Sequence, residues 1–184
     1  MDKNLIDLVK RCQNGDKSAL ISLIKSEENN IYSTLYYLNK DNIELYDIAQ
    51  NVLLKLTTNI KSLKKPEYFK TWLNRITINA YYDYMRKLKR KSKYVKTSEI
   101  PTDIIDGAIS PLNSMLDKEM NKIITKSILY LPKHYKIPIT LREIQGLSYE
   151  DISSITNVSI GTVKSRIARA RGIIKNEINK YKKD

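Results

Sequence analysis

Apolar residues recur at spacings of three and four along almost the whole chain, a pattern that predicts amphipathic helices. The first stripe ends at Asn14-Gly15-Asp16, where Asp16 can cap the helix that follows. The chain has only 5 Gly and 5 Pro in 184 residues, too few for the many turns of an all-β protein. The pattern therefore predicts an all-α fold built from small helical bundles.

One segment of the chain differs from the rest in composition. Residues 97–111 contain three acidic residues, two prolines and no Lys or Arg, although basic helices are predicted on both sides. Such a stretch is typical of an interdomain linker, and an ordered surface loop is the alternative. The sequence thus predicts two small helical domains, residues 1–96 and residues 112–184, joined by an acidic linker.

The N-terminal domain is predicted to be a helical bundle. Apolar stripes at residues 19–24 and 31–38 precede a turn at Asp41-Asn42, and residues 45–56 form a helix with a wide apolar face. A further helix runs from about Tyr68 to Lys91. We expect its apolar stripe to lie in the core: Phe69, Trp72, Leu73, Ile76 and Ala80.

The charge of the chain points to a polyanionic partner. Its 33 Lys and Arg against 20 Asp and Glu give a formal net charge of +13, which suits a nucleic acid or an anionic membrane surface. The N-terminus lacks the apolar stretch of a signal peptide. No apolar run approaches the ~18–20 residues that span a bilayer. We therefore expect a cytoplasmic protein.

Much enzyme chemistry is disfavoured by composition. The single Cys12 excludes an internal disulfide and a Cys-based zinc site, and the single His134 disfavours His-ligated metals and His-centred triads. We expect no cofactor, no metal and no catalytic residue. A nuclease that uses Glu143, Glu150 and Asp151 is a poor alternative, because these carboxylates are better explained as helix-start residues favoured by the helix dipole.

The most specific stretch of the sequence lies between Gly146 and Arg171. Ser148 and Asp151 resemble a capping box, Asn157 suits a left-handed turn position, and Ser159 can cap the next helix. Apolar side chains of both helices are expected to face the core: Ile152, Ile155, Val163, Ile167 and Ala170. Polar side chains of the second helix are left projecting outward: Thr162, Lys164, Ser165, Arg166 and Arg169.

This arrangement has the chemistry of a DNA-reading helix. A capped helix, a short turn and a capped basic helix make a helix-turn-helix, whose hydroxyls and guanidinium forks can bond base edges and phosphates. The plainer alternative is a solvated basic face on an ordinary helical hairpin. That alternative does not account for both caps and the turn, so we interpret the segment as a DNA-binding module.

A second basic surface lies in the N-terminal domain. Seven basic residues and no acidic one occur from Arg86 to Lys96, and Arg75, Asn79 and Asp83 recur at helical spacing upstream. Three tyrosines stand beside this stripe: Tyr81, Tyr82 and Tyr84. Basic and aromatic side chains together fit a surface that tracks a phosphate backbone and holds unstacked bases. The alternative is that the charges are ordinary surface electrostatics and the tyrosines cover the bundle.

Taken together, the two halves resemble the extracytoplasmic-function sigma factors, the smallest sigma subunits of bacterial RNA polymerase. Residues 45–56 look like the family's polymerase-binding helix, and residues 68–86 carry its −10 pattern F-x-x-W-L-x-R-I-x-x-N-x-x-x-D. Leu131-Pro132, Arg142-Glu143 and the ending GTVKSRIARAR look like its −35-reading domain. The chain departs from the family at Asn51, where an acidic residue is common.

The resemblance implies a role for each matching position. Four residues would dock on RNA polymerase core: Asp47, Gln50, Leu53 and Leu54. Seven would act at the −10 element, where Asn79 and the loop 61–68 help to hold a flipped base: Lys61, Lys64, Asn79, Asp83, Arg86, Lys87 and Arg90. Seven would act at the −35 element, with Arg142 or Arg171 on phosphates: Arg142, Thr162, Lys164, Ser165, Arg166, Arg169 and Arg171.

The resemblance also implies partners. These are RNA polymerase core, promoter DNA and an inhibitory anti-sigma factor that masks the polymerase-binding face. The alternative is a dimeric helix-turn-helix regulator that binds a palindrome without polymerase, with the N-terminal bundle as its dimerisation module. The second basic surface, around Asn79–Lys96, argues against that alternative because a dimerisation module has no need of it.

Overall fold

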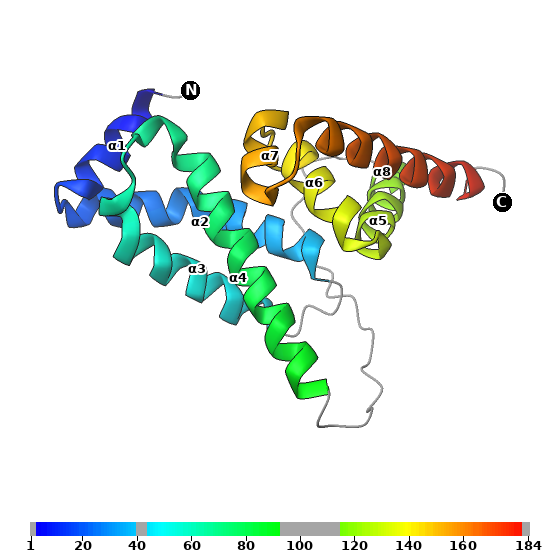
Figure 1. The fold of residues 1–184 in the computed structure, drawn as a ribbon, viewed down its shortest axis with the longest axis horizontal. Helices are drawn as coiled ribbons and strands as arrows, with labels where there is room; N and C mark the ends of the chain where they lie inside the picture. Colours follow the sequence, from blue (N-terminus) through cyan, green and yellow to red (C-terminus); the bar gives the residue numbers. More distant parts are fainter. Residues whose placement is uncertain (1–2, 40–43, 93–114, 182–184) are drawn as a thin grey trace. The chain divides into compact units, whose positions relative to one another are not determined.

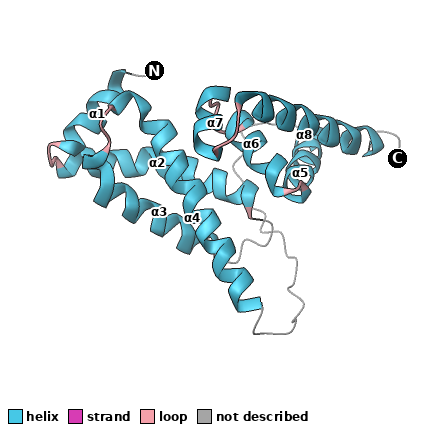
Figure 2. Cartoon of the chain, in the orientation of Figure 1, coloured by secondary structure: helices cyan, strands magenta, loops and turns pink. Residues whose placement is uncertain are grey.

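Short breaks between amphipathic segments give this chain a succession of helices. The computed structural model describes residues 3–39, 44–92 and 115–181, and within those ranges the ordered elements are all helical (Figures 1 and 2). The predicted all-α class is confirmed. The turn expected at Asp41-Asn42 and the linker expected at residues 97–111 lie outside the described residues.

The chain divides into two compact units. Residues 1–35 and 43–98 form the first, here called the N-terminal unit; residues 99–184, with the short segment 36–42, form the second, the C-terminal unit. The helices of the first are α1 (Lys3–Gln13), α2 (Lys17–Leu38), α3 (Leu45–Asn59) and α4 (Phe69–Ser92), with short 3₁₀ turns η1 (Ile60–Ser62) and η2 (Pro66–Tyr68) between α3 and α4. The helices of the second are α5 (Met115–Tyr130), α6 (Lys133–Glu143), α7 (Tyr149–Thr156) and α8 (Ile160–Tyr181).

The break between α1 and α2 forms as its residues predict. Gly15 adopts a positive φ of 88°, and the Asp16 carboxylate accepts the backbone N–H of Ala19 at 3.0 Å. Asp16 also forms an ion pair with Arg11 at 2.7 Å. These bonds satisfy amide donors that the first turn of a helix leaves free. The two stripes expected at residues 19–24 and 31–38 belong to one continuous helix, α2.

Helix α4, the longest helix of the N-terminal unit, packs along α3. Phe69 and Leu73 lie in the core as predicted, but Trp72 is only half-buried, tilted against Phe69 with ring centroids 6.0 Å apart. The predicted core stripe is therefore confirmed for Phe69, Leu73 and Ala80, whereas Trp72 and Ile76 lie at its edge and are half-buried. The α4 helix buries a second flank instead, which includes Ile78 and Tyr81.

In the C-terminal unit, α8 packs against α5, α6 and α7. The predicted inward residues of the last two helices are all buried: Ile152, Ile155, Val163, Ile167 and Ala170. Lys136 is buried as well, and its ammonium donates to the Leu129 carbonyl at 2.5 Å, which satisfies an acceptor at the end of α5. This packing holds α7 and α8 in a fixed mutual orientation.

Candidate nucleic-acid interface

Helices α7 and α8 meet in a helix-turn-helix whose two caps and turn agree with the sequence. The Ser148 hydroxyl oxygen accepts the Asp151 N–H at 3.0 Å, and the Ser159 hydroxyl oxygen accepts the Thr162 N–H at 3.2 Å. Between them, Asn157 is left-handed at φ 54° and ψ 45°. Asn tolerates this conformation better than most residues. The turn therefore forms from local chemistry as well as from packing.

The outward face of α8 carries the residues predicted to read the −35 element. Lys164, Ser165 and Arg169 are exposed, while Thr162 and Arg166 are half-buried. Thr162, Arg166 and Arg169 follow one another at intervals of four and three residues, so they share one side of the helix. The structure thus brings hydroxyl and guanidinium donors onto one face, as a major-groove helix requires.

One flank of this module gathers cations around a single tyrosine. The Tyr149 ring lies 4.8 Å from the Arg142 guanidinium carbon and 5.7 Å from the Lys164 ammonium. Arg142 also donates to the Leu147 carbonyl at 2.7 Å. These contacts restrict the rotamers of both cations before any ligand binds. Tyr149 was not among the residues singled out from the sequence, because only the distances show that one ring serves two cations.

Arg171 is also held by a contact within the protein, in this case with a carboxylate. Its guanidinium donates twice to one Glu143 oxygen, at 3.0 and 2.6 Å, and these bonds raise the pKa of Arg171 above its ordinary value. Both residues expected on phosphates, Arg142 and Arg171, are thus engaged within the protein. A phosphate would have to share these donors or displace their present acceptors.

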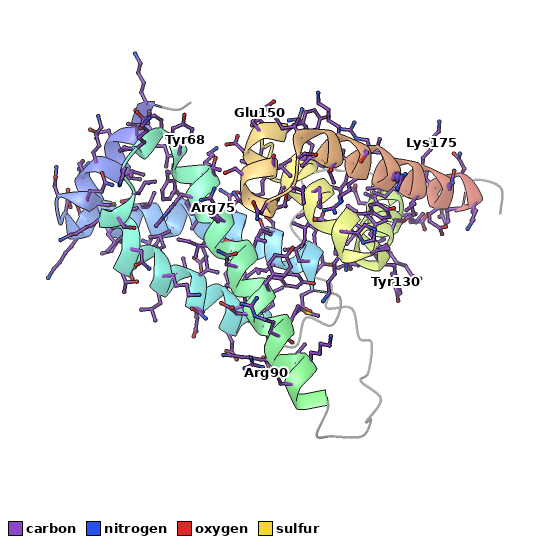
Figure 3. All side chains as sticks on the ribbon, in the orientation of Figure 1. Tyr68, Arg75, Arg90, Tyr130, Glu150 and Lys175 are labelled. Atoms are coloured by element: carbon purple, nitrogen blue, oxygen red, sulfur yellow. The ribbon has the colours of Figure 1, made fainter. Side chains whose placement is uncertain are left out.

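A second polar stripe follows α4. Arg75, Asn79 and Arg86 are exposed along it. Figure 3 labels Tyr68 just before this helix begins, Arg75 in its first half and Arg90 near its end. Of the three tyrosines beside the stripe, Tyr81 and Tyr84 are buried and only Tyr82 reaches the surface. For Tyr81 and Tyr84 the structure thus agrees with the alternative that the tyrosines cover the bundle, and Tyr82 alone of the three stays available beside the polar stripe.

The basic end of α4 surrounds a shallow hollow of about 330 Å³. Asp83 forms ion pairs there with Arg86, three residues on, and with Lys55 of α3 at 3.6 Å. The hollow is lined by Asn51, Asp83, Arg86, Lys87 and Arg90. Three cations against one carboxylate leave a net positive charge around this hollow.

The loop between α3 and α4 adds further cations to the N-terminal unit. Lys61 and Lys64 are exposed, and the Lys65 ammonium lies 5.9 Å from the Tyr68 ring centroid. Tyr68 is 55% exposed, directly beside the fully buried Phe69. An exposed aromatic ring at such a place can stack on an unpaired base. The sequence contained a signal for this exposure: Tyr68 directly precedes the inward Phe69 and therefore lies outside the apolar stripe of the helix.

Helix α3 presents its own exposed face. Asp47 and Gln50 are exposed, Leu54 is 63% exposed, and Leu53 is half-buried. Tyr46 precedes Gln50 and Leu54 at intervals of four residues and is 69% exposed, with its ring edge-on to Tyr32 at 5.4 Å. Exposed Leu and Tyr side chains in one row are typical of a protein-binding surface. Leu54, more than Leu53, is its apolar projection.

Two further observations concern other classes of site. Among the residues that the structure describes, no group of three or more His, Cys, Asp or Glu side chains could hold a metal ion. In the same residues, no helix is both long enough and apolar enough to cross a bilayer.

Each of the two units contains a segment that matches a known protein-family model. Residues 23–91 match the model of Sigma-70 region 2, and residues 122–173 match that of Sigma-70, region 4. The chain is 36% identical over 179 residues to the ECF RNA polymerase sigma-E factor of Haemophilus influenzae, with 93% of each chain covered. It is 33% identical over 187 residues to the protein of that name from Escherichia coli K12, with 97% of each covered.

Solved structures agree with this fold. The sigma factor RpoE from Bartonella quintana, crystallised with the anti-sigma factor NepR, has a TM-score of 0.67 at 24% identity, over 85% of this chain and 94% of that one. CnrH in complex with the cytosolic domain of CnrY has a TM-score of 0.66 at 18% identity, over 95% and 97%.

A helix-turn-helix unit and a basic helical unit, each with its own region model, define a non-enzymatic DNA-binding transcription factor. The chain belongs to the ECF RNA polymerase sigma factors. The alternative of a free-standing dimeric regulator does not account for the region 2 match or for the full-length similarity.

Proposed function

We propose that this alternative sigma factor directs RNA polymerase core to promoters by contacting two elements at once. The observation that carries the proposal is the presence of two separate basic surfaces, one on each unit, each within a matched sigma region. Once one surface has bound its promoter element, the second surface is present at a high effective concentration near the second element. Neither contact needs to be strong by itself, so we expect the free protein to bind promoters weakly.

In this proposal the N-terminal unit acts at the −10 element. Asn79 and the loop that bears Lys61 and Lys64 hold bases of the opened strand, while Tyr68 offers a ring for stacking. Stacking is worth roughly 1–3 kcal/mol per base, which offsets the cost of unpairing without hydrolysis. The basic hollow takes a backbone phosphate on Arg86, Lys87 and Arg90, with Asp83 as the residue that orients Arg86.

The C-terminal unit acts at the −35 element. Thr162, Ser165 and the two arginines, Arg166 and Arg169, read base edges and adjacent phosphates from the outward face of α8. Lys164 contributes from the flank beside Tyr149, and Arg142 or Arg171 contacts the backbone there. We propose domain limits of 1–96 and 112–184, with residues 97–111 as the acidic linker between them.

The exposed face of α3 is proposed to bind polymerase core through Asp47, Gln50 and Leu54, with the half-buried Leu53 at its edge. Two proteins of this fold were solved with a protein partner: the sigma factor RpoE with the anti-sigma factor NepR, and CnrH with the cytosolic domain of CnrY. By analogy we propose an anti-sigma factor that covers this face and silences the protein. Because polymerase core is the proposed partner, we also propose that the protein acts in the cytoplasm.

The test is formation of a complex with bacterial core RNA polymerase on a sizing column. We expect a stoichiometric complex that Leu54→Asp weakens at least about tenfold, because a charge replaces an exposed apolar contact. Ile21→Asp is the matched control, since Ile21 is a comparably exposed apolar residue of the same unit on α2. No complex with wild-type protein, together with a homodimer that selects a palindrome, would refute the proposal.

A further inference from the structure

A glutamine far from any proposed DNA contact holds the loop between α3 and α4. Gln13 is the last residue of α1 and is half-buried. Its amide Nε2 donates to the Ile60 carbonyl at 3.1 Å and to the Leu63 carbonyl at 2.6 Å. One side-chain NH₂ thus uses both of its hydrogens on backbone acceptors 47 and 50 residues away in the sequence.

The two bonded carbonyls belong to the backbone that carries the loop lysines, Lys61 and Lys64. Ile60 begins η1, and its carbonyl also accepts the Leu63 N–H at 3.3 Å, so the two bonded carbonyls stand on either side of Lys61. Leu63 then leaves the turn in an extended conformation and leads directly to Lys64. Ile60 and Leu63 are buried, and α1 packs against both η1 and η2. The backbone on which Lys61 and Lys64 are mounted is therefore tied to α1.

We propose that Gln13 is a positioning residue for promoter opening: its amide holds residues 60–64 in the shape that receives the −10 strand. The proposal rests on the function proposed above for this loop. A loop that is already ordered loses less conformational entropy when it captures an unpaired base. Without the amide, two partly buried carbonyls lose a donor, and the loop gains alternative conformations. Promoter opening then becomes less favourable, although Gln13 touches no DNA.

The decisive variant is Gln13→Glu, which keeps the shape of the side chain but replaces its two donors with acceptors. Gln13→Leu removes the donors without adding charge and is the second variant. The matched control is Asn14→Asp, which makes the same amide-to-carboxylate change at the next residue, on an exposed turn. Each is assembled as holoenzyme on a promoter that the wild-type holoenzyme has selected from randomised DNA.

Opening is followed by permanganate oxidation of unpaired thymines in the −10 region. We expect both Gln13 variants to reduce the open fraction about tenfold, the loss that corresponds to one to two hydrogen bonds. Asn14→Asp should remain close to wild type. Binding to core and to a duplex carrying only the −35 element should not change. Equal effects of the Gln13 variants and Asn14→Asp, or equal losses in all three assays, would overturn the proposal.

A double-mutant cycle separates this proposal from the function on which it rests. If Gln13 acts through the loop cations, Gln13→Glu should cause little further loss in a Lys61→Ala/Lys64→Ala background. Fully additive losses would overturn the positioning role while leaving the loop's own role intact. If Lys61→Ala/Lys64→Ala alone leaves opening unchanged, the loop does not bind the −10 strand, and the proposed roles of the loop and of Gln13 fail together.

Discussion

Helices α4 and α8 are both long, basic and amphipathic, yet their cations are held very differently. Beside α8, Arg142 and Lys164 lie on the Tyr149 ring and Arg171 is bonded to Glu143. Along the basic end of α4, Lys87 and Arg90 surround an open hollow in which Asp83 is the single lining carboxylate. Arg86 is paired with Asp83 there as well, so the contrast lies between the held flank of α8 and the exposed Lys87 and Arg90 that line the hollow.

The difference suits two states of DNA. A duplex presents a regular groove, so donors fixed in advance bind it with little further loss of side-chain entropy. An opened strand has a flexible backbone, which long, exposed lysines and arginines can follow from several rotamers. We therefore expect base-specific effects from Arg166 and Arg169 on the outward face of α8, which the held flank keeps against the groove, and mainly electrostatic effects from the basic end of α4.

The largest effect is expected from Arg166→Ala in holoenzyme. If Arg166 reads a base, the loss should amount to about 1–3 kcal/mol and should fall on one position of the −35 element. The measurement is binding to a set of duplexes with every single-base change at that element. Lys175→Ala, an exposed cation further along α8, is the control. A uniform loss across all duplexes would make Arg166 a phosphate contact and would weaken the contrast with α4.

A smaller effect is expected from Tyr149→Leu, which removes the ring that holds Arg142 and Lys164. Cation–π contacts at exposed sites are worth about 0.5–1 kcal/mol, so affinity for a −35 duplex should fall about two- to fivefold. Tyr149→Phe keeps the aromatic face and should bind almost as wild type. If Tyr149→Phe loses as much as Tyr149→Leu, the hydroxyl rather than the ring face is responsible. Arg142 and Lys164 would then not be held by the Tyr149 ring, and this part of the contrast with α4 would be wrong.

The local chemistry of the helix-turn-helix could be predicted from the sequence. Ser148, Asn157 and Ser159 each act on backbone within a few residues, so their type and spacing specify caps and a turn. The cluster around Tyr149 could not be predicted, because it joins three helices. The bonds of Gln13 were missed for the same reason, since their acceptors lie about fifty residues away. Periodicity also could not separate exposed Tyr82 from buried Tyr81 and Tyr84, because α4 is buried on two flanks.

A change in salt dependence, with a modest loss of affinity, is expected from Lys87→Ala. If Lys87 neutralises one phosphate, the slope of log K against log salt should become shallower by about 0.9, or about 0.7 where the strand is single. Preference among −10 sequences should stay the same. The measurement is a salt titration of holoenzyme on a promoter with a pre-opened −10 region. A changed base preference with an unchanged slope would assign Lys87 to readout and would bring α4 closer to α8.

The two units also differ in a smaller respect: the caps of α7 and α8 are serines, which do not titrate near neutral pH, whereas the cap of α2 is Asp16. The Ala19 N–H foremost, then the Ser18 hydroxyl and the Arg11 guanidinium, lower the pKa of Asp16 below its ordinary value. A carboxyl whose folded-state pKa is lowered stabilises the protein above its unfolded pKa of about 3.9, and this stabilisation is lost as pH falls below that value. Acid should therefore weaken the start of α2, whereas the Ser159 cap of α8, which bonds the hydroxyl and the N–H of Thr162, should not change.

Asp16→Ser tests this difference, because serine retains a cap that does not titrate. At about pH 7 the variant should unfold a few degrees below wild type at most, and the gap should narrow at about pH 3 as Asp16 becomes protonated in the unfolded chain. Trp72 is the single tryptophan and lies in the N-terminal unit, so its fluorescence follows that unit alone. A gap that stays constant with pH would mean that the geometry of the cap, not the charge of Asp16, stabilises α2. The acid response would then no longer distinguish the two units.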